Sequence, residues 1–282
     1  MAALAVAYNL IFGMTGQLSL FQAASFGLSA YASVLFVTRL QWNFWIALIA
    51  AILLVAFVSA IVGAVCFRFK LREFYFAIVT MALSEVLRIG IQNWYDLTNG
   101  TLGISFVQKP QIWTPEGIIS VAKPSSWYLI SLATLATVVI LCSRIETSWI
   151  GRACSAIRLN EALAESIGIN TFSYKLCNFV VASSLAALVG AFYAFFTGFV
   201  EPSYLSVTQS LDIISMVLLG GVNSVAGSIV GAFIFTSLPH IIELAAEVRV
   251  ILYGLILILV ILVLPQGLWS LFGRVRDAAR VA

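Results

Sequence analysis

The charged side chains best placed to bind a partner lie in residues 151–175, which read GRACSAIRLNEALAESIGINTFSYK. The apolar runs on either side, 127–143 and 176–200, contain no Asp, Glu, Lys or Arg. Carboxylates and guanidinium groups in this arrangement form ion pairs and hydrogen bonds with another surface. The chain has no P-loop pattern, no His and Glu at metal-ligand spacing and no Ser/His/Asp set. The sequence therefore predicts a binding segment without catalytic or metal-ligating residues.

The pattern of this segment predicts a short amphipathic helix. At about 3.6 residues per turn, its apolar residues fall near one face and its polar residues near the other. The apolar face comprises Ala153, Ala156, Ile157, Leu163, Ala164 and Ile167, and the polar face comprises Arg152, Ser155, Arg158, Glu161 and Glu165. Gly168 follows where helices commonly end in a left-handed residue, so we expect the helix to end there.

A helix this short needs something to pack against. Glu161 and Glu165 are one turn apart, and such a like-charge pair costs about 0.2–0.5 kcal/mol in an isolated helix. Short helices are marginal in water even without this repulsion. A groove on a partner protein would stabilise the helix, and so would a layer of lipid headgroups. The pattern alone leaves both alternatives open.

The composition of the chain indicates that its apolar runs lie in a lipid bilayer. The 282 residues are 62% hydrophobic and 10% charged, with a mean hydropathy of +1.06, whereas soluble domains carry roughly 25% charged residues. The net charge of +3 gives no sign of nucleic-acid binding. We expect an all-α, polytopic membrane protein that forms a single transmembrane domain over residues 1–282.

The apolar runs predict about 8–9 transmembrane helices, because a span needs about 20 apolar residues. They cover residues 2–13, 18–38, 44–67, 74–92, 127–143, 176–200, 213–242 and 250–264. Gly220-Gly221 interrupts the seventh run. Nine crossings result if this break separates two spans, and seven if the region dips into the membrane and returns. The first run is short, so we expect it to be tilted, buried among other helices or preceded by an upstream extension.

The distribution of Lys and Arg predicts the orientation, since these residues resist translocation. One side of the membrane collects 10 of the 15 basic residues when residues 68–73, 144–175 and the tail from 266 lie there together. We therefore expect the loop at about 144–175 and the C-terminus to be cytoplasmic. The segment at about 93–126 is then the longest outward-facing loop.

Helix breaks and polar groups inside the membrane are the candidates for a translocation path, because both are costly in lipid. Two glycine-broken regions of similar spacing suggest a weak internal repeat, and Glu85 and Arg88 can pair on one helix. The candidates are Gly13, Gly16, Ser19, Thr80, Glu85, Arg88, Gly220, Gly221 and Ser224. The alternative roles are close helix packing through small residues and a structural ion pair near the membrane edge.

Several motifs, in order along nearly the whole chain, resemble those of LivM-type permeases. They are NLIFGMTGQLSLFQAASFGLSAY (9–31), YFAIVTMALSEVLR (75–88), the AIR-x-NE and GIN elements of 151–175, EPSYLSVTQSLDIISMVLLGGVNSVAGSIVGA (201–232) and LPQGLWSLF (264–272). Two positions depart from the loop pattern common in bacterial ABC importers: Leu163 replaces an alanine, and Gly168 lies one residue later. The family usually extends further upstream, so we expect this N-terminus to be short.

The resemblance implies the membrane subunit of an ATP-driven importer of branched-chain or other neutral amino acids, in the bacterial inner membrane. The segment 151–175 would hold a coupling helix in which Arg152, Arg158, Glu161, Glu165 and Gly168 engage an ATPase. The implied partners are a second, LivH-like permease, two cytoplasmic ATPases that bind ATP and Mg, and a periplasmic binding protein. No cofactor is expected in this chain. The alternatives are a urea or short-amide permease and an ATP-independent transporter or channel.

Overall fold

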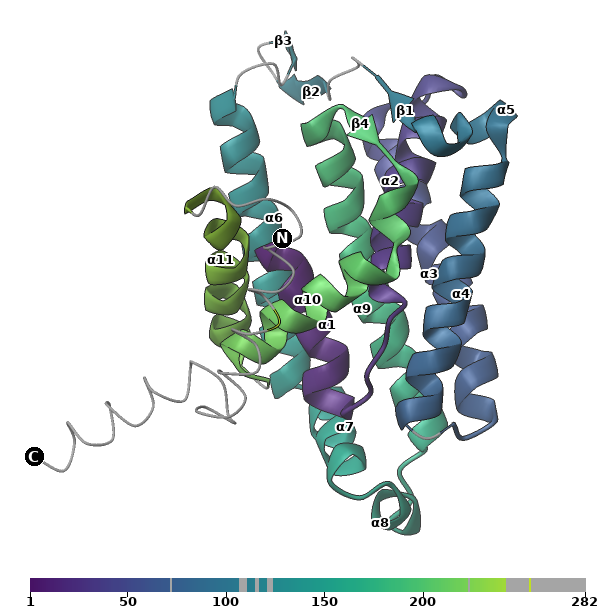
Figure 1. Cartoon of the computed structure of the whole chain (residues 1–282). Helices are drawn as coiled ribbons and strands as arrows, with labels where there is room; N and C mark the ends of the chain where they lie inside the picture. The colour runs from purple at the N-terminus through teal and green to yellow at the C-terminus, as the bar shows by residue number, and fades with distance from the viewer. Residues whose placement is uncertain are drawn as a thin grey trace, which may run out of the picture.

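The computed structural model describes residues 1–71, 73–106, 111–114, 117–120, 124–222, 224–241 and 254. The predicted span 250–264, Gly254 apart, and the tail after it lie outside these residues. The described chain is mainly helical, which confirms the expected all-α fold (Figure 1). Its long helices are α1 (Ala2–Thr15), α2 (Gln22–Thr38), α3 (Phe44–Arg68), α4 (Glu73–Asn93), α6 (Pro124–Thr147), α9 (Thr171–Thr197), α10 (Val207–Gly220) and α11 (Val225–Ile241).

The first helix lies at the centre of the bundle. In α1, 12 of the 14 residues are buried, and the helix contacts α6, α9, α10 and α11. Its apolar residues run all the way round, as expected for a helix without a solvent face. Of the three expectations for this short run, burial among other helices is the one that the structure shows.

The outer helices present apolar side chains to the surroundings. Four described helices, α3, α4, α6 and α9, are long and apolar enough to cross a bilayer, and α10 with α11 passes the same test as a bent pair. Exposed side chains such as Phe57 on α3, Phe74 on α4 and Leu129 on α6 cover this surface. Such a surface is stable in lipid and not in water. The total of eight or nine spans remains a prediction.

The second glycine-rich region is a sharp turn between two helices. The axes of α10 and α11 are bent by 119° at the break, so the chain turns back there (Figure 1). A Cβ atom on Gly220 would lie 2.0 Å from the carbonyl oxygen of Gly227, and one on Gly231 would lie 2.1 Å from that of Met216. Close packing through small residues is therefore confirmed for Gly227 and Gly231, and it extends to Gly220.

The two predicted loops lie at opposite ends of the bundle (Figure 1). At one end are α7 (Trp149–Leu159) and α8 (Glu161–Ser166). At the other end, the segment expected as a plain loop contains α5 (Tyr95–Thr98), a 3-10 turn (Gly100–Leu102) and strands β1 (Ile104–Ser105), β2 (Gln111–Thr114) and β3 (Gly117–Ser120). Strand β1 pairs antiparallel with β4 (Phe199–Val200), and β2 pairs with β3. A second 3-10 turn, Pro202–Leu205, leads from β4 to α10.

The contact between α2 and α9 depends on the absence of a side chain at Gly190. A Cβ atom there would lie 2.1 Å from the carbonyl oxygen of Phe26. We expect Gly190→Ala to lower the free energy of unfolding by about 1–3 kcal/mol, because the two helix backbones must move apart. The thermal unfolding midpoint in detergent measures this change. Gly90→Ala is the matched control, since a Cβ atom at Gly90 meets nothing within 4 Å, and equal midpoints for the two variants would contradict the prediction.

Candidate functional site

The predicted coupling helix consists of two helices, and the expectation of one continuous helix is wrong. The backbone at Asn160 is extended, with φ −161° and ψ 108°, and its Oδ1 accepts a hydrogen bond of 3.1 Å from the N–H of Leu163. Asparagine favours this arrangement because its short side chain replaces the missing backbone acceptor at a helix start. Asn160 directly before Glu161 is thus the sequence signal for the break.

The break changes which apolar residues are buried. Ala153 and Ile157 of α7 are 7% and 3% exposed, as the predicted apolar face requires. Leu163 and Ile167 are 61% and 69% exposed, so only Ala164 of the predicted apolar face is buried in α8. Leu159, at the end of α7, is 88% exposed. The α7–α8 segment therefore packs its first part on the bundle and presents apolar side chains from its second part.

The predicted helix end at Gly168 is confirmed. Gly168 has φ +88°, its N–H donates to the Glu165 carbonyl at 3.0 Å, and the N–H of Ile169 donates to the Ala164 carbonyl at 3.0 Å. This pair of bonds is the Schellman arrangement that satisfies the last carbonyls of a helix. The left-handed backbone explains why this residue is glycine. Lack of space does not, because nothing lies within 4 Å of a Cβ atom at this position.

Each of the two repelling carboxylates has its own lysine. Glu161 pairs with Lys175 at 2.6 Å, and only 10% of the Lys175 side chain is exposed. Glu165 pairs with Lys70 at 2.9 Å and accepts a hydrogen bond of 2.8 Å from the Thr171 hydroxyl. The hydrogen bond from Lys70 lowers the pKa of Glu165, and the same bond raises the pKa of Lys70. The cost of the like-charge pair is thereby offset by contacts from α9 and from the end of α3.

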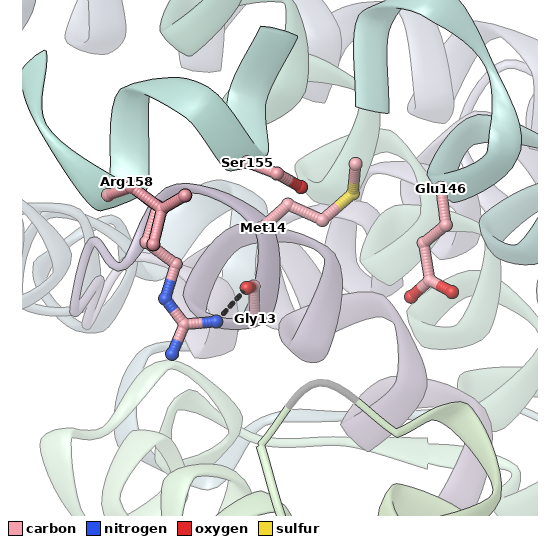
Figure 2. A pocket seen from close by; sticks show the side chains of 6 residues that line it. Gly13, Met14, Glu146, Ser155 and Arg158 are labelled. Atoms are coloured by element: carbon pink, nitrogen blue, oxygen red, sulfur yellow. Dashed lines mark hydrogen bonds between the residues drawn. The ribbon is translucent and has the colours of Figure 1, made fainter. Parts of the chain in front are cut away.

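The two arginines of α7 differ in what they contact. Arg152 lies 5.6 Å from the Trp149 ring centre and donates to the Thr147 carbonyl at 3.1 Å. Arg158 donates from Nη1 to the carbonyl of Gly13 in α1. Figure 2 shows the Arg158 guanidinium pointing at this carbonyl oxygen. One residue predicted for coupling thus meets one predicted for the path.

A pocket of about 580 Å³ lies at this junction of α1, α6 and α7. Gly13, Met14, Glu146, Ser155, Arg158 and Leu159 line it. Glu146 lies across the pocket from Arg158 (Figure 2). Helix α7 therefore touches the end of α1 beside an open space.

The first glycine break is held by side chains from two other helices. Helix α1 ends at Thr15, the following residue Gly16 is left-handed with φ +71°, and α2 begins at Gln22. Between them the N–H of Leu20 donates to the Thr80 hydroxyl oxygen at 3.1 Å. The Leu20 carbonyl accepts from the hydroxyls of Ser84 at 2.9 Å and Ser210 at 2.8 Å. Thr80 was predicted from the sequence, and Ser84 and Ser210 were missed.

Two buried amide side chains strengthen the same region and were also missed. Gln22 donates to the Ala182 carbonyl at 2.9 Å, and Asn178 donates to the Leu10 carbonyl at 2.9 Å. Both side chains are at most 2% exposed. Polar residues inside apolar runs are the signal for such contacts, because an amide in lipid needs a partner.

Ser19, Gly221 and Ser224 have local roles at the two breaks. The Ser19 hydroxyl oxygen accepts from the N–H of Phe21 at 3.2 Å, and that of Ser224 accepts from the N–H of Gly227 at 3.0 Å. Gly221 has φ +110°, which favours glycine. These contacts satisfy backbone groups where each helix resumes. A role of any of them in transport remains a prediction.

Glu85 and Arg88 form the expected ion pair on α4. Arg88 Nε donates to both Glu85 oxygens at 3.0 and 2.9 Å, and Nη1 donates to Gln92 at 3.1 Å. The Glu85 and Arg88 side chains are 35% and 26% exposed. Glu85 lies near the middle of a span of 20 residues, Phe74–Asn93. The ion pair on α4 is confirmed, and its position relative to the membrane remains a prediction.

The structural and sequence features agree with a family of membrane transport proteins. Residues 1–261 match the family described as branched-chain amino acid transport system / permease component, and the chain belongs to this family. The resemblance to LivM-type permeases is confirmed. The match does not favour the urea-permease and ATP-independent alternatives.

Named relatives cover most of this chain. It is 26% identical over 285 residues to the high-affinity branched-chain amino acid transport system permease protein LivM of Escherichia coli K12, covering 94% of this chain and 66% of that protein. It is 24% identical over 290 residues to LivH of Salmonella typhimurium, covering 95% and 90%. The ribose import permease protein RbsC of Haemophilus influenzae is 24% identical over 222 residues, covering 72% and 63%. The chain thus spans just under two thirds of the length of this LivM relative. No solved structure matches it.

The two hydroxyls on the Leu20 carbonyl should act as a unit. We expect Ser84→Ala or Ser210→Ala alone to cost about 0.5–1 kcal/mol, because the other hydroxyl still satisfies the carbonyl. The double variant should cost more than the sum, since it leaves a buried acceptor without a partner. Thermal unfolding in detergent gives the values. Ser215→Ala is the control, because its hydroxyl bonds only the Leu211 carbonyl of the same helix, and simple additivity of the Ser84 and Ser210 effects would refute the expectation.

The two glutamates of α8 should differ in their contribution to stability. Glu161→Gln should cost about 1–3 kcal/mol, because it leaves the nearly buried Lys175 ammonium without its counter-charge. Glu165→Gln should shift the unfolding midpoint less, since Lys70 is 70% exposed. The effect of Glu165→Gln should also disappear at low pH. A carboxylate with a lowered pKa stabilises the fold above its unfolded pKa and loses this as pH falls through the folded pKa. Equal midpoint shifts for both variants at neutral pH would count against this assignment.

Proposed function

We propose that the chain is the transmembrane permease subunit of an ATP-driven importer that moves branched-chain or other neutral amino acids into the cytoplasm by alternating access. The observation that carries the proposal is the exposed α7–α8 segment on a chain of this family. An apolar surface outside the lipid-facing helices favours binding to a partner protein. The family is described as the permease component of a transport system, so further protein components are expected.

The exposed leucines and isoleucine of this segment would seat on a cytoplasmic ATPase. Helix α8 has only six residues, too few to be stable alone, and Ala164 is its one buried residue. Burying a fully exposed Leu or Ile contributes about 1.5–3 kcal/mol. Leu159, Leu163 and Ile167 together therefore offer enough apolar surface for a specific contact, with Arg152, Glu161 and the Gly168 turn at its rim.

The partly exposed ion pair on α4 supports a location for the translocation path. Lipid strongly disfavours an exposed Glu85–Arg88 pair near the middle of a span. This face of α4 would therefore border a water-filled path or a companion permease. Relatives named LivM and LivH support pairing with a second, homologous permease.

The remaining parts of the system would be separate chains. Two ATPases would bind ATP and Mg, and a periplasmic binding protein would deliver the amino acid. The chain would lie in the bacterial inner membrane with the α7–α8 end and the C-terminus in the cytoplasm. This orientation rests on the excess of Lys and Arg at that end.

Reconstitution tests the proposal. The proteoliposomes would contain this chain, its companion permease and the ATPases, with the binding protein and leucine on the side of the membrane opposite the ATPases. Leucine should cross the membrane to the ATPase side only when ATP is present on that side. Leucine uptake by this chain alone, without ATPases, would refute the proposal.

The proposed docking surface of Leu159, Leu163 and Ile167 can be tested by a single substitution. Leu163→Gln should weaken ATPase association about tenfold or more, because burial of this leucine contributes at least about 1.4 kcal/mol, a factor of ten in affinity. Co-purification of the ATPase at graded concentrations measures the change. Leu102→Gln is the matched control, since Leu102 is 78% exposed at the opposite end of the bundle. Equal ATPase binding by the two variants would contradict the assigned surface.

A further inference from the structure

We infer that the break between α1 and α2 is the element that transmits movement of α7 to α4, and that Arg158 is the positioning residue that holds its cytoplasmic end. The inference rests on the proposed function, in which an ATPase moves α7. It assigns a mechanical role to Arg158, Thr80, Ser84 and the segment 13–20.

The first link joins α7 to the end of α1. The last carbonyls of a helix lack an intrahelical donor, and they form the negative end of the helix dipole. Gly13 lies in the last turn of α1, and the Arg158 guanidinium donates to its carbonyl. The Cγ of Arg158 also lies 3.2 Å from the position of a Cβ atom on Gly16. A charge-assisted bond and a packed methylene thus attach the side chain to both sides of the helix end.

The second link joins the break to α4. Both polar groups of Leu20 bond to α4, the N–H to Thr80 and the carbonyl to Ser84. Ser210 ties the same carbonyl to α10. Because these groups are buried inside the bundle, a displaced Leu20 would leave donors and acceptors there without partners. Leu20 and this part of α4 are therefore held together when either moves.

The break itself is the place where the two helices can turn relative to each other. Residues between Gly16 and Gln22 are not helical, and a few residues at an element end can absorb a large backbone change. Ser84 directly precedes Glu85, so the Leu20 contact lies beside the polar face of α4. A shift of α7 would reach this face through Arg158, Gly13 and Leu20.

Removal of the arginine tests the first link. In the complete transporter, Arg158→Ala should lower the amount of leucine taken up per ATP hydrolysed at least tenfold. Arg158→Lys should recover part of the uptake, because an ammonium can still donate to the Gly13 carbonyl. Arg144→Ala, at an exposed position near the same end, is the control and should leave both rates unchanged. Equal losses of hydrolysis and uptake in Arg158→Ala would overturn the inference, since they would indicate loss of docking or folding.

A disulfide in place of the Arg158 contact tests whether this contact transmits movement from α7 to α1 or only stabilises the fold. Gly16→Cys with Arg158→Cys, in a Cys177→Ser background, should have low uptake when reduced. On oxidation, a disulfide between positions 16 and 158 should restore uptake, because it rejoins α7 to α1. Arg158→Cys alone should not respond to oxidant. An oxidised, cross-linked pair that hydrolyses ATP without restored uptake would overturn the inference.

Failure of the proposed function and failure of this inference are distinguishable. If the unaltered transporter shows no ATP-dependent leucine uptake, the proposed function fails. If the unaltered transporter shows such uptake and the Arg158→Ala transporter shows the same uptake, only this inference fails.

Discussion

The rest of the structure depends on how the polar backbone groups at the α1–α2 break are satisfied. In lipid no water can bond to a free N–H or carbonyl, so a broken helix persists only where other side chains supply partners. Thr80, Ser84 and Ser210 supply them for Leu20, and Arg158 supplies one for Gly13. These hydrogen-bond partners come from α4, α10 and α7. Satisfying one short break therefore draws three distant parts of the chain to the centre of the bundle.

The α7–α8 segment divides its residues between this centre and the outside. Its first half buries Ala153 and Ile157 against the bundle and reaches inward through Arg158. Its second half exposes Leu163 and Ile167. The extended backbone at Asn160 makes the division possible, because it turns α8 out of register with α7. A segment built in this way can hold a partner on one surface while it remains attached to the membrane helices by the other.

The helices around the centre differ in what they present to lipid. Most exposed side chains of α3, α4 and α6 are apolar, and lipid can cover them. The exposed part of Glu85 and Arg88 is an exception near the middle of α4. This polar face lies one residue from Ser84, which bonds the break. Structural support of the break and the proposed border of the path are therefore adjacent on one helix.

The sequence by itself determined the class of fold, the positions of most helices, the two breaks and the left-handed end at Gly168. These features follow from local chemistry: apolar run length, glycine conformation and charge distribution. Only the tertiary structure decided that α1 is central, that Glu161 and Glu165 pair with Lys175 and Lys70, and that Arg158 caps α1. Partners of polar groups in a membrane protein come from residues far along the chain, and the pattern around each residue carries no information about which helix will lie beside it. The break at Asn160 was readable from its capping side chain, yet the exposure of Leu163 was not, because it depends on what the rest of the bundle leaves uncovered.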